Sequence, residues 1–211
     1  MPRHSCSITL QLEHDSDYQF LNALRMASGY PAYHPAHISL ISRLKVFSSL
    51  DPARSELAAL VRELQLVAKR ARPFRIGYLR MDPHTPFGKG AGCVALTVEN
   101  TPDLNSLVAV LESSVNQQLA WIRKERNFVP HLTIDSSVLF LRRIANVCNA
   151  QMRRSHVTGL ELWEHKEGRR TLLWAFRFRP ARRPATRPHL NKPLHHRPRG
   201  GRLCSLEWNR I

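Results

Sequence analysis

The sequence lacks any apolar run that approaches the ~20 residues a membrane-spanning helix needs. Its first residues also lack the apolar stretch that marks a secretory signal. These two absences argue against a protein that spans a membrane or is exported. We therefore expect a soluble protein of the cytoplasm.

Cysteine is scarce, and its four positions are far apart: Cys6, Cys93, Cys148 and Cys204. No C-x-x-C pair is present, and no closely spaced histidines complete a zinc site. Scattered cysteines in an intracellular chain are typical of reduced thiols. The composition thus predicts no metal centre and no cofactor.

Acidic residues are few relative to basic ones. Asp and Glu total 16 against 32 Lys and Arg, which leaves a formal net charge of +16 in a chain of 211 residues. An excess of this size is typical of a protein whose partner is a polyanion, either nucleic acid or an anionic membrane face.

The basic charge continues into the last part of the chain. Residues 181–211 contain eight Lys or Arg, one Glu and four prolines, with no apolar periodicity. Such a segment cannot bury enough apolar surface to offset its ordering entropy. We expect a folded domain over residues 1–180 and a disordered tail over 181–211. A nucleic-acid arm or a nuclear-import signal is the alternative for the tail, which would extend the location to the nucleus.

Strand patterns and amphipathic helix patterns alternate along residues 1–180. Strands are predicted at 7–12, 37–47, 74–80, 93–99, 128–134, 157–163 and 171–178, the last two forming a hairpin. Helices are predicted at 18–27, after Asp51 as N-cap and Pro52 as first residue, after Thr101 as N-cap and Pro102, and at 138–152. Sheets with helices on one face would bury every apolar stripe, so the sequence predicts an α+β fold.

Two segments share one pattern, a proline followed by histidine, an apolar residue, a hydroxyl residue and an apolar residue. They are PAHISL at 35–40 and VPHLTI at 129–134. In a strand, side chains alternate between the two faces, so His37 and Ser39 would share one face, as would His131 and Thr133. The pattern predicts two imidazoles and two hydroxyls around a space the size of a phosphate.

This set of groups suits phosphodiester chemistry. One neutral imidazole can take a proton from an attacking water while the other, protonated, gives a proton to the departing sugar oxygen. The hydroxyls of Ser39 and Thr133 would donate hydrogen bonds to the non-bridging phosphoryl oxygens. We expect His37, His131, Ser39 and Thr133 to be the catalytic residues, and the reaction needs no metal.

The short pattern His-x-Ser/Thr occurs four times in the chain, because His14 and His156 also begin one. Neither of these two has the complete alternation of the pair at His37 and His131. A single match would favour a structural histidine, whereas the joint occurrence of two full motifs in a basic chain favours catalysis.

On these motifs, the sequence resembles the two-histidine phosphoesterases, also called the 2′-5′ RNA ligase or RNA 2′,3′-cyclic phosphodiesterase family. The tetrapeptides HISL at 37–40 and HLTI at 131–134 match its hallmark, and the lead-in RNFVP before His131 resembles that of the family. The resemblance covers about residues 5–180 and implies a bilobal, pseudo-twofold fold with a cleft between two antiparallel sheets. It assigns His37 as acid and His131 as base, although the near symmetry of the two positions leaves these roles open.

Three further residues near the motifs are candidates for substrate binding. Tyr33 and Phe128 precede the two motifs, where an aromatic ring could stack on a terminal base; core packing is the alternative for Phe128. Arg126 belongs to a basic cluster suited to backbone phosphates, with a solvated turn as the alternative.

The resemblance implies a monomeric enzyme that opens 2′,3′-cyclic phosphates of RNA ends or small nucleotides, commonly to a 2′-phosphate, with weak reverse 2′-5′ ligation in some members. A 3′ exoribonuclease, a 2′-5′ oligonucleotide phosphodiesterase or an ADP-ribose cyclic-phosphate hydrolase would use the same two histidines. A non-catalytic RNA-binding module is the rival from another class, and it would favour arginine over imidazole. None of these hypotheses includes a membrane partner.

Overall fold

The computed structural model describes residues 3–31, 34–79, 94–119, 129–135 and 153–180. All of them belong to one compact unit, Met1–Ala181. The predicted helix at 138–152 and the basic segment 181–211 lie outside the described residues.

The described chain contains strands, three α-helices and one 3₁₀ turn. In chain order they are β1 (Arg3–Leu12), α1 (Ser16–Ala27), β2 (Ser39–Phe47), η1 (Pro52–Arg54), α2 (Glu56–Arg70), β3 (Phe74–Gly77), β4 (Val94–Thr97), α3 (Pro102–Leu119), β5 (His131–Asp135), β6 (Arg154–Lys166) and β7 (Arg169–Arg177). The predicted α+β fold with two antiparallel sheets is confirmed.

The larger sheet has five strands built around β6. Strand β1 pairs with one edge of β6 and with β2, while β7 and then β3 pair with the opposite edge of β6. Strands β6 and β7 form the predicted hairpin, whose two-residue turn at Glu167 and Gly168 has positive φ at both positions. This is the turn geometry that best matches the twist of paired strands.

The smaller sheet consists of β4 and β5, and isolated bridges join it to the larger one. Tyr78, just after β3, pairs with Val98, just after β4. On the other side, Ile38, just before β2, pairs with Leu132 of β5. The second of these junctions lies within the two histidine motifs.

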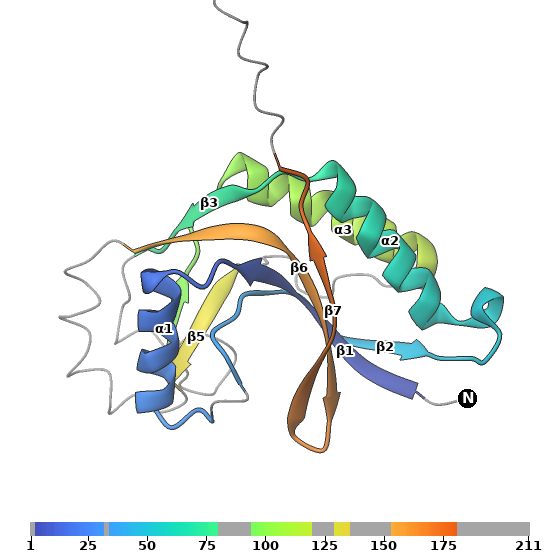
Figure 1. The fold of residues 1–211 in the computed structure, drawn as a ribbon, viewed down its shortest axis with the longest axis horizontal. Helices are drawn as coiled ribbons and strands as arrows, with labels where there is room; N and C mark the ends of the chain where they lie inside the picture. The colour runs from blue at the N-terminus through green and yellow to red at the C-terminus, as the bar shows by residue number, and fades with distance from the viewer. Residues whose placement is uncertain (1–2, 32–33, 80–93, 120–128, 136–152, 181–211) are drawn as a thin grey trace, which may run out of the picture. The chain divides into compact units, whose positions relative to one another are not determined.

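Helices α2 and α3 lie side by side over one face of the five-stranded sheet, whereas α1 lies beside β5 (Figure 1). Apolar positions of β1 and the stripes of α2 and α3 meet in one continuous core. Leu60 and Leu64 of α2 and Leu104 and Leu111 of α3 are fully buried. Burial of the two stripes confirms the helical periodicity predicted for both helices.

The alternation of β1 separates an apolar side from a polar one. Cys6, Ile8 and Leu10 belong to the core, whereas Ser7 and Thr9 point the other way and are buried as well. A buried polar row on a central strand requires partners. Ser7 lies 2.8 Å from Nε2 of His165, and the partners of Thr9 belong to the candidate site.

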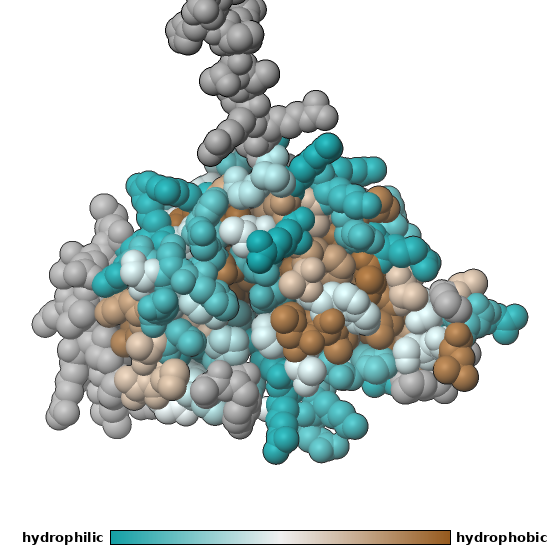
Figure 2. Space-filling model, in the orientation of Figure 1, coloured by the Kyte–Doolittle hydropathy of each residue, from teal (hydrophilic) through white to brown (hydrophobic). Residues whose placement is uncertain are grey.

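The solvent-facing surface seen in Figure 2 is mostly hydrophilic, with apolar side chains visible in separate patches. No described helix is both long enough and apolar enough to cross a membrane.

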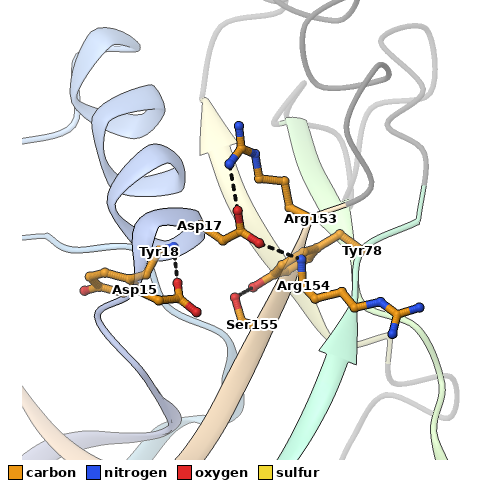
Figure 3. A network of polar contacts seen from close by, with 7 residues as sticks. All are labelled: Asp15, Asp17, Tyr18, Tyr78, Arg153, Arg154 and Ser155. Carbon is orange, nitrogen blue, oxygen red and sulfur yellow. Dashed lines mark hydrogen bonds and ion pairs between the residues drawn. The ribbon is translucent and has the colours of Figure 1, made fainter. Parts of the chain in front are cut away.

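A polar network fixes the first turn of α1 to the start of β6 (Figure 3). Asp15 caps the helix by accepting a hydrogen bond from the backbone N–H of Tyr18 at 2.9 Å. Asp17 forms an ion pair with Arg153 at 2.7 Å and accepts the backbone N–H of Arg154 at 3.1 Å. The N-terminus of α1 is thus held against the sheet that carries much of the site.

Two expectations about element ends are corrected by the structure. Asp51 caps only the 3₁₀ turn, accepting the N–H of Ala53 at 2.9 Å, and α2 begins after Ser55, whose hydroxyl accepts the N–H of Ala58. Strand β2 begins at Ser39, and Ile38 forms only an isolated bridge with Leu132 of β5. His37 therefore lies before the strand.

Candidate functional site

The two histidine motifs lie next to each other where the sheets join. Ile38 and Leu132 are partners in an antiparallel bridge, and both are fully buried. The backbone N–H of Leu10 donates to the carbonyl of Ile38 at 3.0 Å, so the first motif lies between β1 and β5. The second residue of each motif therefore anchors it in the core.

Alternation turns the other residues of the motifs to the opposite side. His37, Ser39, His131 and Thr133 are all partly exposed, in contrast to the apolar residues between them. Since Ile38 faces Leu132 in an antiparallel bridge, His37 lies across from Thr133 and Ser39 from His131. The two histidines occupy diagonal positions, which in such pairing are about 7–8 Å apart.

Both imidazoles are oriented by the same kind of hydrogen bond. Nδ1 of His37 lies 2.8 Å from the carbonyl oxygen of Pro35, and Nδ1 of His131 lies 3.0 Å from that of Val129. Each carbonyl belongs to the residue two positions upstream and can only accept. These contacts favour a proton on Nδ1 in both rings, which leaves the Nε2 lone pair for chemistry.

Arg25 of α1 connects the two motifs through their backbone carbonyl groups. Arg25 is 2% exposed, and its guanidinium donates to the carbonyl oxygens of Thr133 and His34 and lies 4.1 Å from the ring centroid of Tyr30. One side chain thereby ties the backbone of the second motif to the segment that leads into the first.

Arg170, the second residue of β7, lies beside His37. Its Nη1 atom is 2.7 Å from Nδ1 of His37. Burial and the positive charge of Arg170 lower the pKa of His37 to about 3. Burial also lowers the pKa of His131, opposed by the hydrogen bond to Val129. Both shifts favour the neutral form of the imidazole in the free protein.

A set of hydrogen-bonded side chains from β1 and β6 lies next to the first motif. Thr9 pairs with Ser39 across the strands and is fully buried. The indole N–H of Trp163 lies 2.9 Å from a carboxylate oxygen of Glu161 and 3.1 Å from the hydroxyl of Thr9. Burial raises the pKa of Glu161.

Three sequence-predicted substrate-binding residues, Tyr33, Phe128 and Arg126, lie outside the described residues.

The structure brings together the four residues expected to act in catalysis. The two weaker motif matches have other partners: His14 stacks on Tyr18, and His156 forms an ion pair with Glu13 at 2.7 Å.

The sequence reasoning missed Arg25, Arg170, Glu161 and Thr9. The position of Arg170 at the start of a strand was only a weak indication that it faces inward. Other arginines at the starts of strands, such as Arg3 and Arg154, are exposed. Within the described ranges, no group of three or more His, Cys, Asp or Glu is arranged to hold a metal ion.

The sequence pattern of the 2′-5′ RNA ligase superfamily matches residues 14–169 of the chain. The chain therefore belongs to this superfamily, a family of two-histidine phosphoesterases. This membership identifies an enzyme of the phosphoesterase type. No curated protein sequence matches the chain.

Solved structures with the same fold include LigT of Escherichia coli complexed with 3′-AMP. LigT is 17% identical to this chain, the TM-score is 0.54, and the match covers 83% of this chain and 99% of LigT. TT0787 of Thermus thermophilus is 16% identical with a TM-score of 0.55 over 84% of this chain and 100% of its own. LigT was also solved with NADP+, at 14% identity and a TM-score of 0.52 over 83% and 99% of the two chains. At these identities the likeness concerns the fold alone.

Proposed function

We propose that the protein is a phosphodiesterase that opens 2′,3′-cyclic phosphates on RNA ends or small nucleotides, using His37 and His131 as an acid and base pair. The observation that carries this proposal is the bridge between Ile38 and Leu132, because it aligns the two motifs side by side in opposite directions. Each imidazole then has the hydroxyl residue of the other motif opposite it, an arrangement suited to holding one phosphate.

The proposed reaction is a single displacement at phosphorus. The neutral imidazole takes a proton from water as the water oxygen bonds to phosphorus. The bond from phosphorus to the 3′ oxygen breaks, and the protonated imidazole gives that oxygen its proton. The product is a 2′-phosphate with a free 3′ hydroxyl. In this scheme the two histidines carry out both proton transfers, and no metal ion takes part.

Ser39 and Thr133 are the proposed donors to the non-bridging oxygens. These oxygens gain negative charge as the water attacks, and donors fixed in advance stabilise that charge without reorganisation. Both residues are partly exposed in the site and belong to paired strands, which limits their movement.

The electrostatics of the free protein favour His37 as base and His131 as acid, the reverse of the roles that the family resemblance assigned. His37 lies 2.7 Å from the permanently charged Arg170, which opposes protonation of the ring. The acid must be protonated before the reaction begins, and His37 is the less suited of the two rings to that role. Burial lowers the pKa of His131 as well, but without the contribution of Arg170 that acts on His37, so His131 is the easier of the two to protonate.

RNA is the proposed source of the substrate. The net charge of +16 suits a polyanion, and the two LigT structures contain the nucleotides 3′-AMP and NADP+. We further propose residues 181–211 as a basic extension of the domain at 1–180 that increases RNA affinity without taking part in the reaction.

An oligoribonucleotide with a 2′,3′-cyclic phosphate end, incubated with protein and EDTA, tests the proposal. We expect ring opening by wild type and a loss of at least about 100-fold in His37→Ala and in His131→Ala, with RNA binding retained. His156→Ala is the matched control, because His156 also begins a His-x-Thr sequence but is paired with Glu13. An untouched cyclic end with wild type, or full activity in either motif variant, would refute the reaction and favour an RNA-binding module.

A further inference from the structure

Arg170 is a buried arginine in the hairpin of β6 and β7. Only 7% of it is exposed, and its guanidinium carbon lies 4.6 Å from the ring centroid of Trp163. It stands one residue beyond the range matched by the superfamily pattern, 14–169. This cation–π contact with Trp163 holds the guanidinium beside His37.

The contact with His37 does not satisfy both partners. Nη1 of Arg170 can only donate, so it requires a lone pair on Nδ1 of His37. The carbonyl oxygen of Pro35 can only accept, so it requires a hydrogen on the same Nδ1 atom. One atom cannot meet both requirements at once, and the equivalent contact of His131 with Val129 favours the hydrogen.

The other donors of Arg170 are also unused. Its Nε and Nη2 atoms are buried and have no hydrogen-bond partner among the described residues. Glu161, the carboxylate that most favours its charge, forms no ion pair with it within the described chain and instead engages Trp163 and Thr9. A buried cation without acceptors is costly, which points to an anionic acceptor that comes from outside the chain.

We propose that Arg170 binds the phosphate group of the substrate, donating from its guanidinium to the non-bridging oxygens of the phosphodiester beside His37. A guanidinium presents parallel N–H groups that match two oxygens of one phosphate. This inference rests on the proposed function for the nature of the phosphate. It adds a positively charged ligand to the two hydroxyls of the motifs and comes from a strand that contains neither motif.

Calorimetric titration of the full-length protein with 2′-AMP, the product of opening a cyclic adenosine phosphate, tests the role of Arg170. Arg170→Met should weaken binding about 10- to 100-fold, since a hydrogen bond to a charged group is lost. Arg170→Lys, which keeps the charge but not the fork, should fall between Arg170→Met and wild type. Arg177→Met is the matched control on the same strand, because Arg177 is exposed, and it should bind 2′-AMP as wild type does.

Equal affinity of Arg170→Met and wild type would overturn the inference, as would a wild type that does not bind 2′-AMP. If Arg170→Met does not fold, side-chain ¹⁵N resonances of wild type replace it: the Nε–H signal of Arg170 should shift during the titration. An unchanged Arg170 signal, while signals of other site residues shift, would also overturn it.

Failure of the proposed reaction would look different. A wild type that leaves cyclic phosphates intact but binds 2′-AMP through Arg170 would refute the reaction and support the phosphate site. A wild type that opens cyclic phosphates, with KM and kcat unchanged in Arg170→Met, would support the reaction and refute the phosphate site.

Discussion

Arg25 donates a hydrogen bond to the carbonyl oxygen of Thr133, from a helix more than a hundred residues earlier in the chain. The same guanidinium donates to the carbonyl of His34 at 3.3 Å. A single buried side chain thus connects the strand of the second motif with the approach to the first. The relative position of the two imidazoles depends on this connection as well as on the bridge between Ile38 and Leu132.

Replacement of Arg25 by methionine should therefore affect both stability and activity. Removing the donor leaves two backbone carbonyls without it, and we expect a loss of about 1–3 kcal/mol in the free energy of unfolding. Catalysis should fall further than stability explains, seen as a lower kcat in protein shown to be folded by circular dichroism.

Arg62→Met on the exposed side of α2 is the control for Arg25→Met, and it should change neither quantity. An Arg25→Met protein that keeps the wild-type kcat would show that the connection does not position the motifs.

The roles of the two histidines can be separated with a substrate whose leaving group needs no proton. A phosphodiester that releases 4-nitrophenolate departs without an acid, so only the base remains essential. With His37 as base, His131→Ala should recover much of its lost rate on this substrate, while His37→Ala should not.

Recovery confined to His37→Ala would restore the roles suggested by the family resemblance. Equal failure of both variants would indicate that each imidazole also binds the phosphate. The rate of nitrophenolate release, followed by absorbance, distinguishes the three outcomes.

The lowered pKa of His37 predicts a loss of stability in acid. Its pKa is about 3 in the folded state and about 6.5 in an unfolded chain. Between these values the unfolded state binds a proton that the folded state does not, so stability present above pH 6.5 falls as the pH decreases. The fall amounts to at most about 1.4 kcal/mol per pH unit from this residue.

Urea unfolding at pH 7 and pH 5 measures this effect. His37→Gln removes the titrating ring, so its free energy of unfolding should change less between the two pH values than that of wild type. His156→Gln, which alters a more exposed histidine paired with Glu13, serves as the control. An identical pH dependence in His37→Gln and wild type would mean that His37 is not held neutral.

The basic segment 181–211 carries a net charge of +7, from eight Lys or Arg and one Glu. Its removal should leave kcat on a cyclic mononucleotide unchanged but weaken binding to a longer RNA. The logarithm of the binding constant should also depend less steeply on the logarithm of salt concentration, because fewer counterions are released. Filter binding across a salt series gives this slope, and an equal slope with and without the segment would rule out a role in RNA binding.

The sequence alone was enough to predict the α+β class and most element positions, because alternation and helical periodicity are local properties. The stripe of α3 and its start after Thr101 agree with the structure, and Thr101 does accept the N–H of Leu104 at 3.2 Å. Asp51 was misleading because Ser55, a competing cap four residues later, lies closer to the apolar stripe of α2.

The motifs at His37 and His131 were also predictable from the sequence, since each contains its own alternation of imidazole, core residue and hydroxyl. What only the tertiary structure decided is what surrounds them. Ile38 finds Leu132 rather than another strand, Arg25 reaches Thr133, and Arg170 comes to lie against His37. These are contacts between residues far apart in the chain, and their formation depends on how the sheets pack, which no local pattern records. The sequence determined which groups could do the chemistry, and packing determined their charge state and their neighbours.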